Sequence, residues 1–208
     1  MSTQQNKIFS ILLILFIPIF IGGISDGVTD DILDEVRKVI KDGYDSIKLE
    51  DQNRAYGELM FGDSLEAVVA KLKKDGSLEV TYPSYDGGVV AGFNIGETEF
   101  TLSPEFYNGK LYKVVLNGLL YDSSYCYRCA ERDFYTLVKV ITEKYGPPDV
   151  VGGESVAWRC GRKFIFVGVF GRRLRATCWI VDKIVKGVID KQEQDQDQEE
   201  IHDKSKYF

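Results

Sequence analysis

A stretch with helical periodicity followed by a run of β-like segments occurs twice along this chain. A helix is expected over 64–74 in the first copy and over 131–145 in the second, because apolar residues recur there every three or four positions. The segments that follow are short, rich in apolar residues and bounded by turn residues, which is typical of strands. This order predicts an α+β fold made of tandem helix-plus-antiparallel-sheet units, with the helices on one face of the sheet.

The turns between the expected strands favour an antiparallel meander in each unit. Asn108-Gly109 tolerates the positive φ angles of a tight hairpin, and glycine-arginine pairs at 161–162 and 171–172 are expected to join the last three strands. The strands are expected at about 78–82, 89–95, 98–102, 111–116, 155–160, 163–170 and 173–181.

The first 25 residues form a segment of their own. Lys7 and the α-amino group precede an apolar run over 8–21, and small residues follow it. This is the layout of a secretory signal peptide cleaved before Asp26. A retained membrane anchor is the alternative, because residues 8–25 number 18, close to the roughly 20 that a spanning helix needs. In both cases the charge of Lys7 keeps the N-terminus cytoplasmic. The rest of the chain is therefore expected to be exported, either as a periplasmic or secreted protein or held at the membrane by this segment.

Two further segments flank the expected globular domain. Residues 26–56 predict an amphipathic helix, over about 29–42, and a polar linker. Residues 191–208 are mostly polar and charged, and they bury too little apolar surface to offset the entropy cost of ordering. They predict a disordered acidic tail. The domain between these segments is expected at 57–190, with pseudo-repeats at about 57–120 and 121–190.

Composition excludes several classes of function. The chain has a formal net charge of −6, and its one histidine, His202, lies in the acidic tail. General binding to phosphate backbones needs a surplus of Lys and Arg. A histidine base or a Ser-His-Asp triad needs a histidine in the folded domain. We therefore expect a non-enzymatic protein with no cofactor, no metal ion and no nucleic-acid partner.

Alternation along the last three expected strands divides their side chains into two faces. The apolar face is expected to meet the helices as the core; its members are Val156, Trp158, Ile165, Val167, Val169, Leu174, Ala176, Cys178 and Ile180. The opposite face combines aromatic and arginine side chains, which are enriched at interface hot spots; its members are Phe164, Phe166, Phe170, Trp179, Arg159, Arg173 and Arg175.

The aromatic and arginine face is the candidate binding surface, because helices on one side of the sheet leave it open. The alternative is that its aromatic side chains pack against the N-terminal helix or the first unit. The segment 159–175 holds six basic and no acidic residues. The expected partner is therefore an acidic patch on another protein or an anionic envelope component.

Several local signals resemble those of known exported proteins. They are the helix start Phe61-Gly62-Asp63-Ser64, the hairpin Tyr107 to Tyr112, and Lys144-Tyr145-Gly146-Pro147 ahead of Trp158. Together they are similar to small exported α/β proteins, a group that includes β-lactamase inhibitor protein and the outer-membrane-assembly lipoproteins of the SmpA/OmlA type. The resemblance covers about 61–182. It implies a helix pair packed on one face of an antiparallel sheet, acting through protein contacts rather than catalysis. Unlike those lipoproteins, this chain has no cysteine directly after its apolar run.

The four cysteines, Cys126, Cys129, Cys160 and Cys178, are expected to be structural, as disulfides or buried thiols. In a simple meander, Cys160 and Cys178 lie roughly 10 Å apart on the first and third strands, beyond the roughly 7 Å that a disulfide spans. They are therefore expected to pair with Cys126 and Cys129 or to remain buried thiols.

A thiol oxidoreductase using Cys126 and Cys129 is one alternative function, because a helix N-terminus lowers the pKa of a thiol. A membrane-anchored structural protein of the envelope is the other. An exported protein-interaction or envelope-associated binding domain is the function that the sequence favours.

Overall fold

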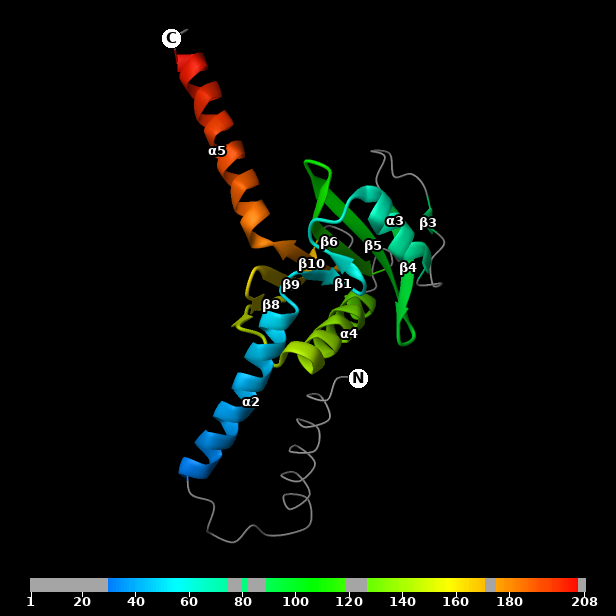
Figure 1. The fold of residues 1–208 in the computed structure, drawn as a ribbon, viewed down its shortest axis with the longest axis vertical. Coiled ribbons are helices and arrows are strands. Elements are labelled where there is room, and N and C mark those ends of the chain that lie inside the picture. The colour runs from blue at the N-terminus through cyan, green and yellow to red at the C-terminus, as the bar shows by residue number, and fades with distance from the viewer. Residues whose placement is uncertain (1–29, 75–79, 82–88, 119–126, 171–174, 206–208) are drawn as a thin grey trace. The chain divides into compact units, whose positions relative to one another are not determined.

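The computed structural model describes residues 30–74, 80–81, 89–118, 127–170 and 175–205 (Figure 1). The expected signal peptide or anchor, residues 1–25, lies outside these ranges. The chain divides into two compact units, Met1–Ile47 and Lys48–Phe208. Across the described ranges, no helix has the length and apolar character needed to cross a membrane.

Helix α2 (Asp30–Glu50) runs well past its expected end near residue 42. Gly43 does not stop it, because a glycine inside a helix costs only about 1 kcal/mol relative to alanine. An ion pair between Lys41 and Asp45, 2.5 Å apart, spans the glycine at helical spacing. The prediction of a linker before residue 57 is therefore wrong in large part. That segment contains the end of α2 and strand β1 (Arg54–Tyr56).

An eight-stranded antiparallel sheet forms the centre of the second unit in the described part of the chain. Its strands run in the order β3-β4-β5-β6-β10-β9-β8-β7, so that two meanders meet at their last strands, β6 and β10. One helix precedes each meander, as Figure 1 shows. The predicted α+β class is confirmed. The elements are α3 (Leu65–Lys74), β3 (Val80–Thr81), β4 (Val90–Ile95), β5 (Thr98–Tyr107), β6 (Lys110–Gly118), α4 (Tyr127–Tyr145), β7 (Val150–Val151), β8 (Ser155–Cys160), β9 (Lys163–Phe170) and β10 (Arg175–Asp182).

A small separate sheet joins β1 to β2 (Leu59–Met60) just before α3. The expected hairpin between β5 and β6 is confirmed. Asn108 and Gly109 both adopt positive φ angles, 50° and 70°, as a tight turn of this kind requires.

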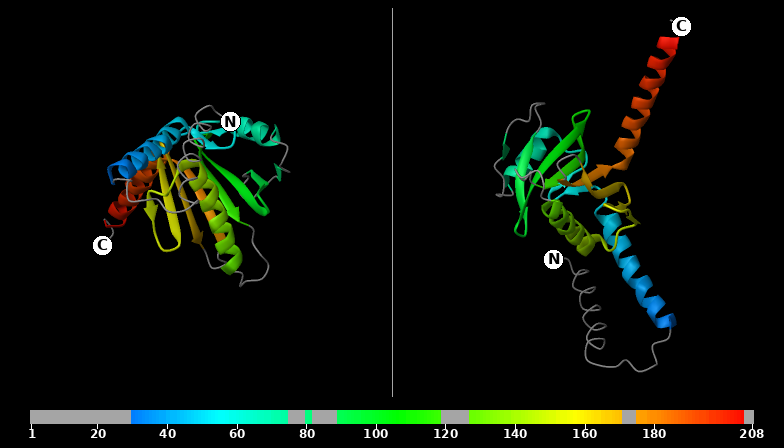
Figure 2. Two further views of the ribbon diagram at one scale, coloured as in Figure 1. Left: turned by 90° about the horizontal axis from the view of Figure 1, so that it is seen from below. Right: turned by 180° about the vertical axis from the view of Figure 1, so that it is seen from behind.

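Helix α4 packs against β9 and β10 (Figure 2). The strand register places Cys178 opposite Val167 on β9 and opposite Leu116 on β6, so these three side chains share the face toward α4. All three are buried, as are Trp158 on β8 and Leu137 on α4. The predicted core face is therefore found among the described residues. Of its other members, Val169 is half-buried, and Leu174 lies outside the described residues.

Helix α5 (Lys183–Ser205) continues directly from β10 and runs through most of the segment predicted to be disordered. Asp182 caps it, since its carboxylate accepts a hydrogen bond from the backbone N–H of Ile184 at 3.0 Å. Lys186 and Asp190 form an ion pair one turn apart. Lys, Gln and Glu are also good helix formers. The prediction of disorder is wrong for 191–205, because a helix can be stabilised by propensity and local pairs without burying an apolar face.

Candidate functional site

The aromatic and arginine residues predicted to share one face of the sheet do share it where the structure describes them. Trp179 on β10 pairs with Phe166 on β9, and Arg175 pairs with Phe170. On β8, Arg159 pairs with Phe164. Each of these residues alternates with the buried side chains that face α4, so they point to the opposite side of the sheet. Arg173 lies outside the described residues.

Three of these side chains form a stacked group, here called the aromatic cluster: Phe166, Phe170 and Trp179. The ring centroids of Phe170 and Trp179 are 5.2 Å apart with planes within 2° of parallel. Phe166 lies 5.4 Å from Trp179 and 5.6 Å from Phe170. These separations fall in the favourable range for aromatic pairs. The cluster is therefore ordered by its own contacts.

Gly168 makes room for the aromatic cluster. It lies between Phe166 and Phe170 on the same face of β9, because alternate residues of a strand point the same way. A Cβ atom at this position would lie 2.9 Å from the Phe170 ring and 3.0 Å from the Phe166 ring. A residue with a side chain would thus push the two rings apart. The glycine lets both rings lean together over the backbone.

The aromatic cluster is partly open to solvent. Phe170 is 39% exposed and Trp179 is 36% exposed. The first meander does not cover them, because its strands continue the same sheet beside β10. Packing of the aromatic side chains against the first unit, one of the two alternatives for this face, is therefore excluded.

Basic side chains share the open face of the sheet with the aromatic cluster. The Lys113 ammonium lies 5.2 Å from the centre of the Trp179 ring and forms an ion pair with Glu105 at 2.8 Å. Arg159 is exposed. Arg175 is half-buried, and its Nε atom is buried without a hydrogen-bond partner among the described residues. Burial also lowers the pKa of the Arg175 guanidinium from its usual value. The face therefore offers aromatic surface next to hydrogen-bond donors.

A second polar group, on the helix side of the sheet, was not predicted. Lys163 is 1% exposed, and its Nζ donates to the Asp51 carboxylate at 2.7 Å and to the Tyr145 hydroxyl at 2.8 Å. It also donates to the backbone carbonyl of Asp51 at 2.9 Å. The backbone carbonyl of Arg54 is a fourth acceptor, at 3.2 Å. The acceptors therefore satisfy all three N–H bonds of the ammonium group. We call Lys163, Asp51 and Tyr145 the lysine cluster.

Burial and hydrogen bonding together shift the pKa values of the lysine cluster. Burial alone would raise the pKa of Asp51, but hydrogen bonds from Lys144, Lys163 and Tyr145 outweigh it and hold this pKa below its usual value. Burial raises the pKa of the Tyr145 hydroxyl, and its hydrogen bond to Asp51 raises it further. Burial also lowers the pKa of Lys163, against the attraction of Asp51. All N–H donors of Lys163 are satisfied, so this residue does not serve as a free base. Its hydrogen bonds instead hold β9 to Asp51, just after α2, and to Tyr145 on α4.

One feature of the sequence could have predicted a buried lysine at this place. Lys163 occupies an inward position of an alternating strand, in step with Ile165 and Val167. A buried lysine needs acceptors. The sequence could not show which ones, because Asp51 lies in the segment predicted to be a linker.

The cysteines divide into two kinds. Cys160 and Cys178 are free and buried. Of the two predicted alternatives, disulfides to Cys126 and Cys129 or buried thiols, the second is found. Burial raises the pKa of the Cys160 thiol to about 11 and raises that of Cys178 as well. Such thiols are poor nucleophiles. Cys129 is disulfide-bonded, and Cys126 lies outside the described residues.

Within the described ranges, no cluster of His, Cys, Asp and Glu side chains could hold a metal ion. No family model, curated protein or solved structure matches this chain. The resemblance to β-lactamase inhibitor protein and the outer-membrane-assembly lipoproteins thus stays a prediction.

Proposed function

We propose that this protein is an exported, non-enzymatic binding domain that holds a protein partner against the aromatic cluster. One observation carries the proposal: Phe166, Phe170 and Trp179 are stacked and partly exposed on a sheet face that α4 does not cover. Interface hot spots are enriched in tryptophan and arginine and lie in well-packed patches. The apolar N-terminal segment supports export.

Ordering of the cluster favours tight binding. Each flexible side chain that an interface immobilises costs about 0.5–1.5 kcal/mol. The stacked rings have already lost much of that freedom, and Gly168 allows their arrangement. A partner therefore meets a preorganised apolar surface.

The basic side chains define the chemistry of the partner. Arg159 is exposed. A carboxylate on the partner would accept a charge-assisted hydrogen bond from its guanidinium group. The partner surface is thus apolar at its centre and acidic at its edge.

Site-specific photo-cross-linking tests this function in cells that express the protein. A photoreactive phenylalanine analogue at Phe170 or Trp179 should form one and the same discrete adduct. The matched control is the analogue at Tyr135, an exposed aromatic position on α4. Absence of an adduct from the two cluster positions, or the same adducts from Tyr135, would rule out a binding face at the aromatic cluster.

A thiol oxidoreductase is the second candidate, and the disulfide at Cys129 in the first turn of α4 favours it. The measurement is the reduction potential of this disulfide, together with reduction of insulin by the dithiol form. A potential in the range of structural disulfides, below about −300 mV, and no insulin reduction would exclude this function.

A further inference from the structure

A cavity of about 170 Å³ lies between α4, the sheet and β1. The sheet contributes Leu116, Cys178 and Ile180 to its wall, and α4 contributes Leu137 and Val140. Most of the remaining lining is also apolar. The cavity lies on the helix side of the sheet, away from the aromatic cluster.

The cavity is large enough for a small molecule. An engineered apolar cavity of about 150 Å³ in another protein stays dry and takes up benzene. A well-packed protein interior holds few voids of this size, since side chains interdigitate closely. Water that enters from the solvent side meets an apolar lining, and a hydrocarbon group of similar size would remove that lining from water.

Solvent reaches the cavity along α4. Leu137 is buried at 1% exposure, whereas Val140, one turn later on the same side of the helix, is 42% exposed. Both line the cavity. A ligand can therefore enter beside Val140 and place its apolar end against Leu137 and the sheet.

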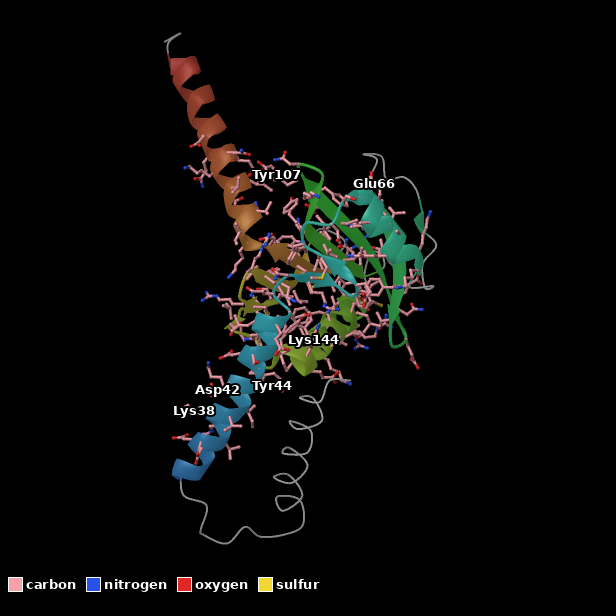
Figure 3. The ribbon with its side chains drawn as sticks, in the orientation of Figure 1. Lys38, Asp42, Tyr44, Glu66, Tyr107 and Lys144 are labelled. Carbon is pink, nitrogen blue, oxygen red and sulfur yellow. The ribbon has the colours of Figure 1, made fainter. Side chains whose placement is uncertain are left out.

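One end of the cavity is positively charged. Arg54 and Lys144 both line it, and their side chains are 44% and 45% exposed. Lys144 lies on the last turn of α4 and is labelled in Figure 3. Both cations contact the Asp51 carboxylate, at 3.0 Å from Arg54 Nε and 2.8 Å from Lys144 Nζ. Asp51 also neutralises Lys163. A single carboxylate thus serves three cations, which leaves an excess of positive charge at this end.

We propose that this cavity binds a small carboxylic acid with an apolar body, such as a medium-chain fatty acid. The hydrocarbon part packs between α4 and the sheet, and the carboxylate lies at the end formed by Arg54 and Lys144. The apolar wall accounts for the body of the ligand, and the excess positive charge accounts for its head group.

The test uses saturation-transfer NMR titrations of the full-length protein with hexanoate and with its uncharged analogue n-hexanol. Hexanoate should bind about fivefold more tightly, a difference that matches one partly exposed charge pair. Lys144→Gln should remove most of this difference and leave the affinity for n-hexanol unchanged. Lys139→Gln, at an exposed position of the same helix that does not line the cavity, is the matched control.

A second variant shows where the ligand binds. Val140→Trp fills the entrance from an exposed position, so the fold should persist while binding of both molecules is lost. Val188→Trp places the same side chain at an exposed position of α5 and should bind normally. Failure of hexanoate to bind, equal affinity for the two molecules, or unchanged binding by Val140→Trp would each overturn the proposal.

Discussion

The two faces of the sheet carry similar side chains that differ in their exposure to solvent. Each holds one of the two tryptophans of the chain. Trp158, on the helix side, is fully buried, and its Nε1 donates to the Gly146 carbonyl at 2.9 Å. Trp179, on the open side, is stacked against the Phe166 and Phe170 rings and is more than a third exposed. The difference separates residues that hold the fold together from residues that are ordered but still available to a partner.

Lysines repeat this contrast. Lys163, on the helix side, donates to four neighbouring acceptors inside the protein. Lys113, on the open side, forms one ion pair near the surface and lies over Trp179. The buried lysine is part of the core, whereas the partly exposed one is part of the surface that we propose for binding.

Replacing the two tryptophans should give the largest difference between the faces. Trp158→Ala is expected to lower the free energy of unfolding by about 4 kcal/mol, because it leaves a large cavity in the core. Trp179→Ala should cost about 1.5 kcal/mol, mainly the loss of ring stacking. Urea unfolding of the two variants measures both values. Equal losses would mean that the open face is core after all.

The two lysines should differ by a smaller amount. Lys163→Met is expected to destabilise the fold by about 3 kcal/mol, because it leaves Asp51 with one cation fewer in a buried setting. Lys113→Met should change stability by less than about 1 kcal/mol, as is usual for ion pairs near the surface. Urea unfolding again provides the measurement. A loss below about 1 kcal/mol for Lys163→Met would show that the lysine cluster does not anchor the fold.

The smallest effect is expected in acid. The pKa of Asp51 lies below its ordinary value of 3.8, so its ionised form stabilises the fold above that pH. This contribution is lost as the pH falls through the folded-state pKa. Asp51→Asn should therefore be less stable at neutral pH but lose less stability below about pH 4.

Thermal unfolding as a function of pH measures this effect. The control is Asp34→Asn, which alters an exposed carboxylate of α2. A variant at Asp51 that loses stability in acid as steeply as the unaltered protein would show that this carboxylate does not stabilise the fold.

Local patterns allowed much of the sheet to be predicted. Alternation with period two assigned Phe166 and Trp179 to one face and Val167 and Cys178 to the other, because a strand has only two faces. Asn108-Gly109 identified a hairpin because few residues tolerate its backbone angles. These signals depend on neighbours in the chain.

The features that were missed depend on contacts between distant segments. The lysine cluster joins Asp51 to Lys163, more than a hundred residues along the chain. The cavity needs α4, the sheet and β1 together. The length of α5 was missed for a different reason, since a composition typical of disorder also contains strong helix formers.

The seam between β6 and β10 also bears on how the chain folds. Each meander is built from hairpins whose strands are neighbours in sequence, whereas Thr177 on β10 donates a hydrogen bond to Asn117 on β6, 60 residues away. Closing a loop of that length costs more chain entropy than closing a hairpin turn. Folding rates fall as such distant pairings come to dominate a topology. We therefore expect joining of the two meanders, rather than formation of either one, to set the speed at which the sheet is completed.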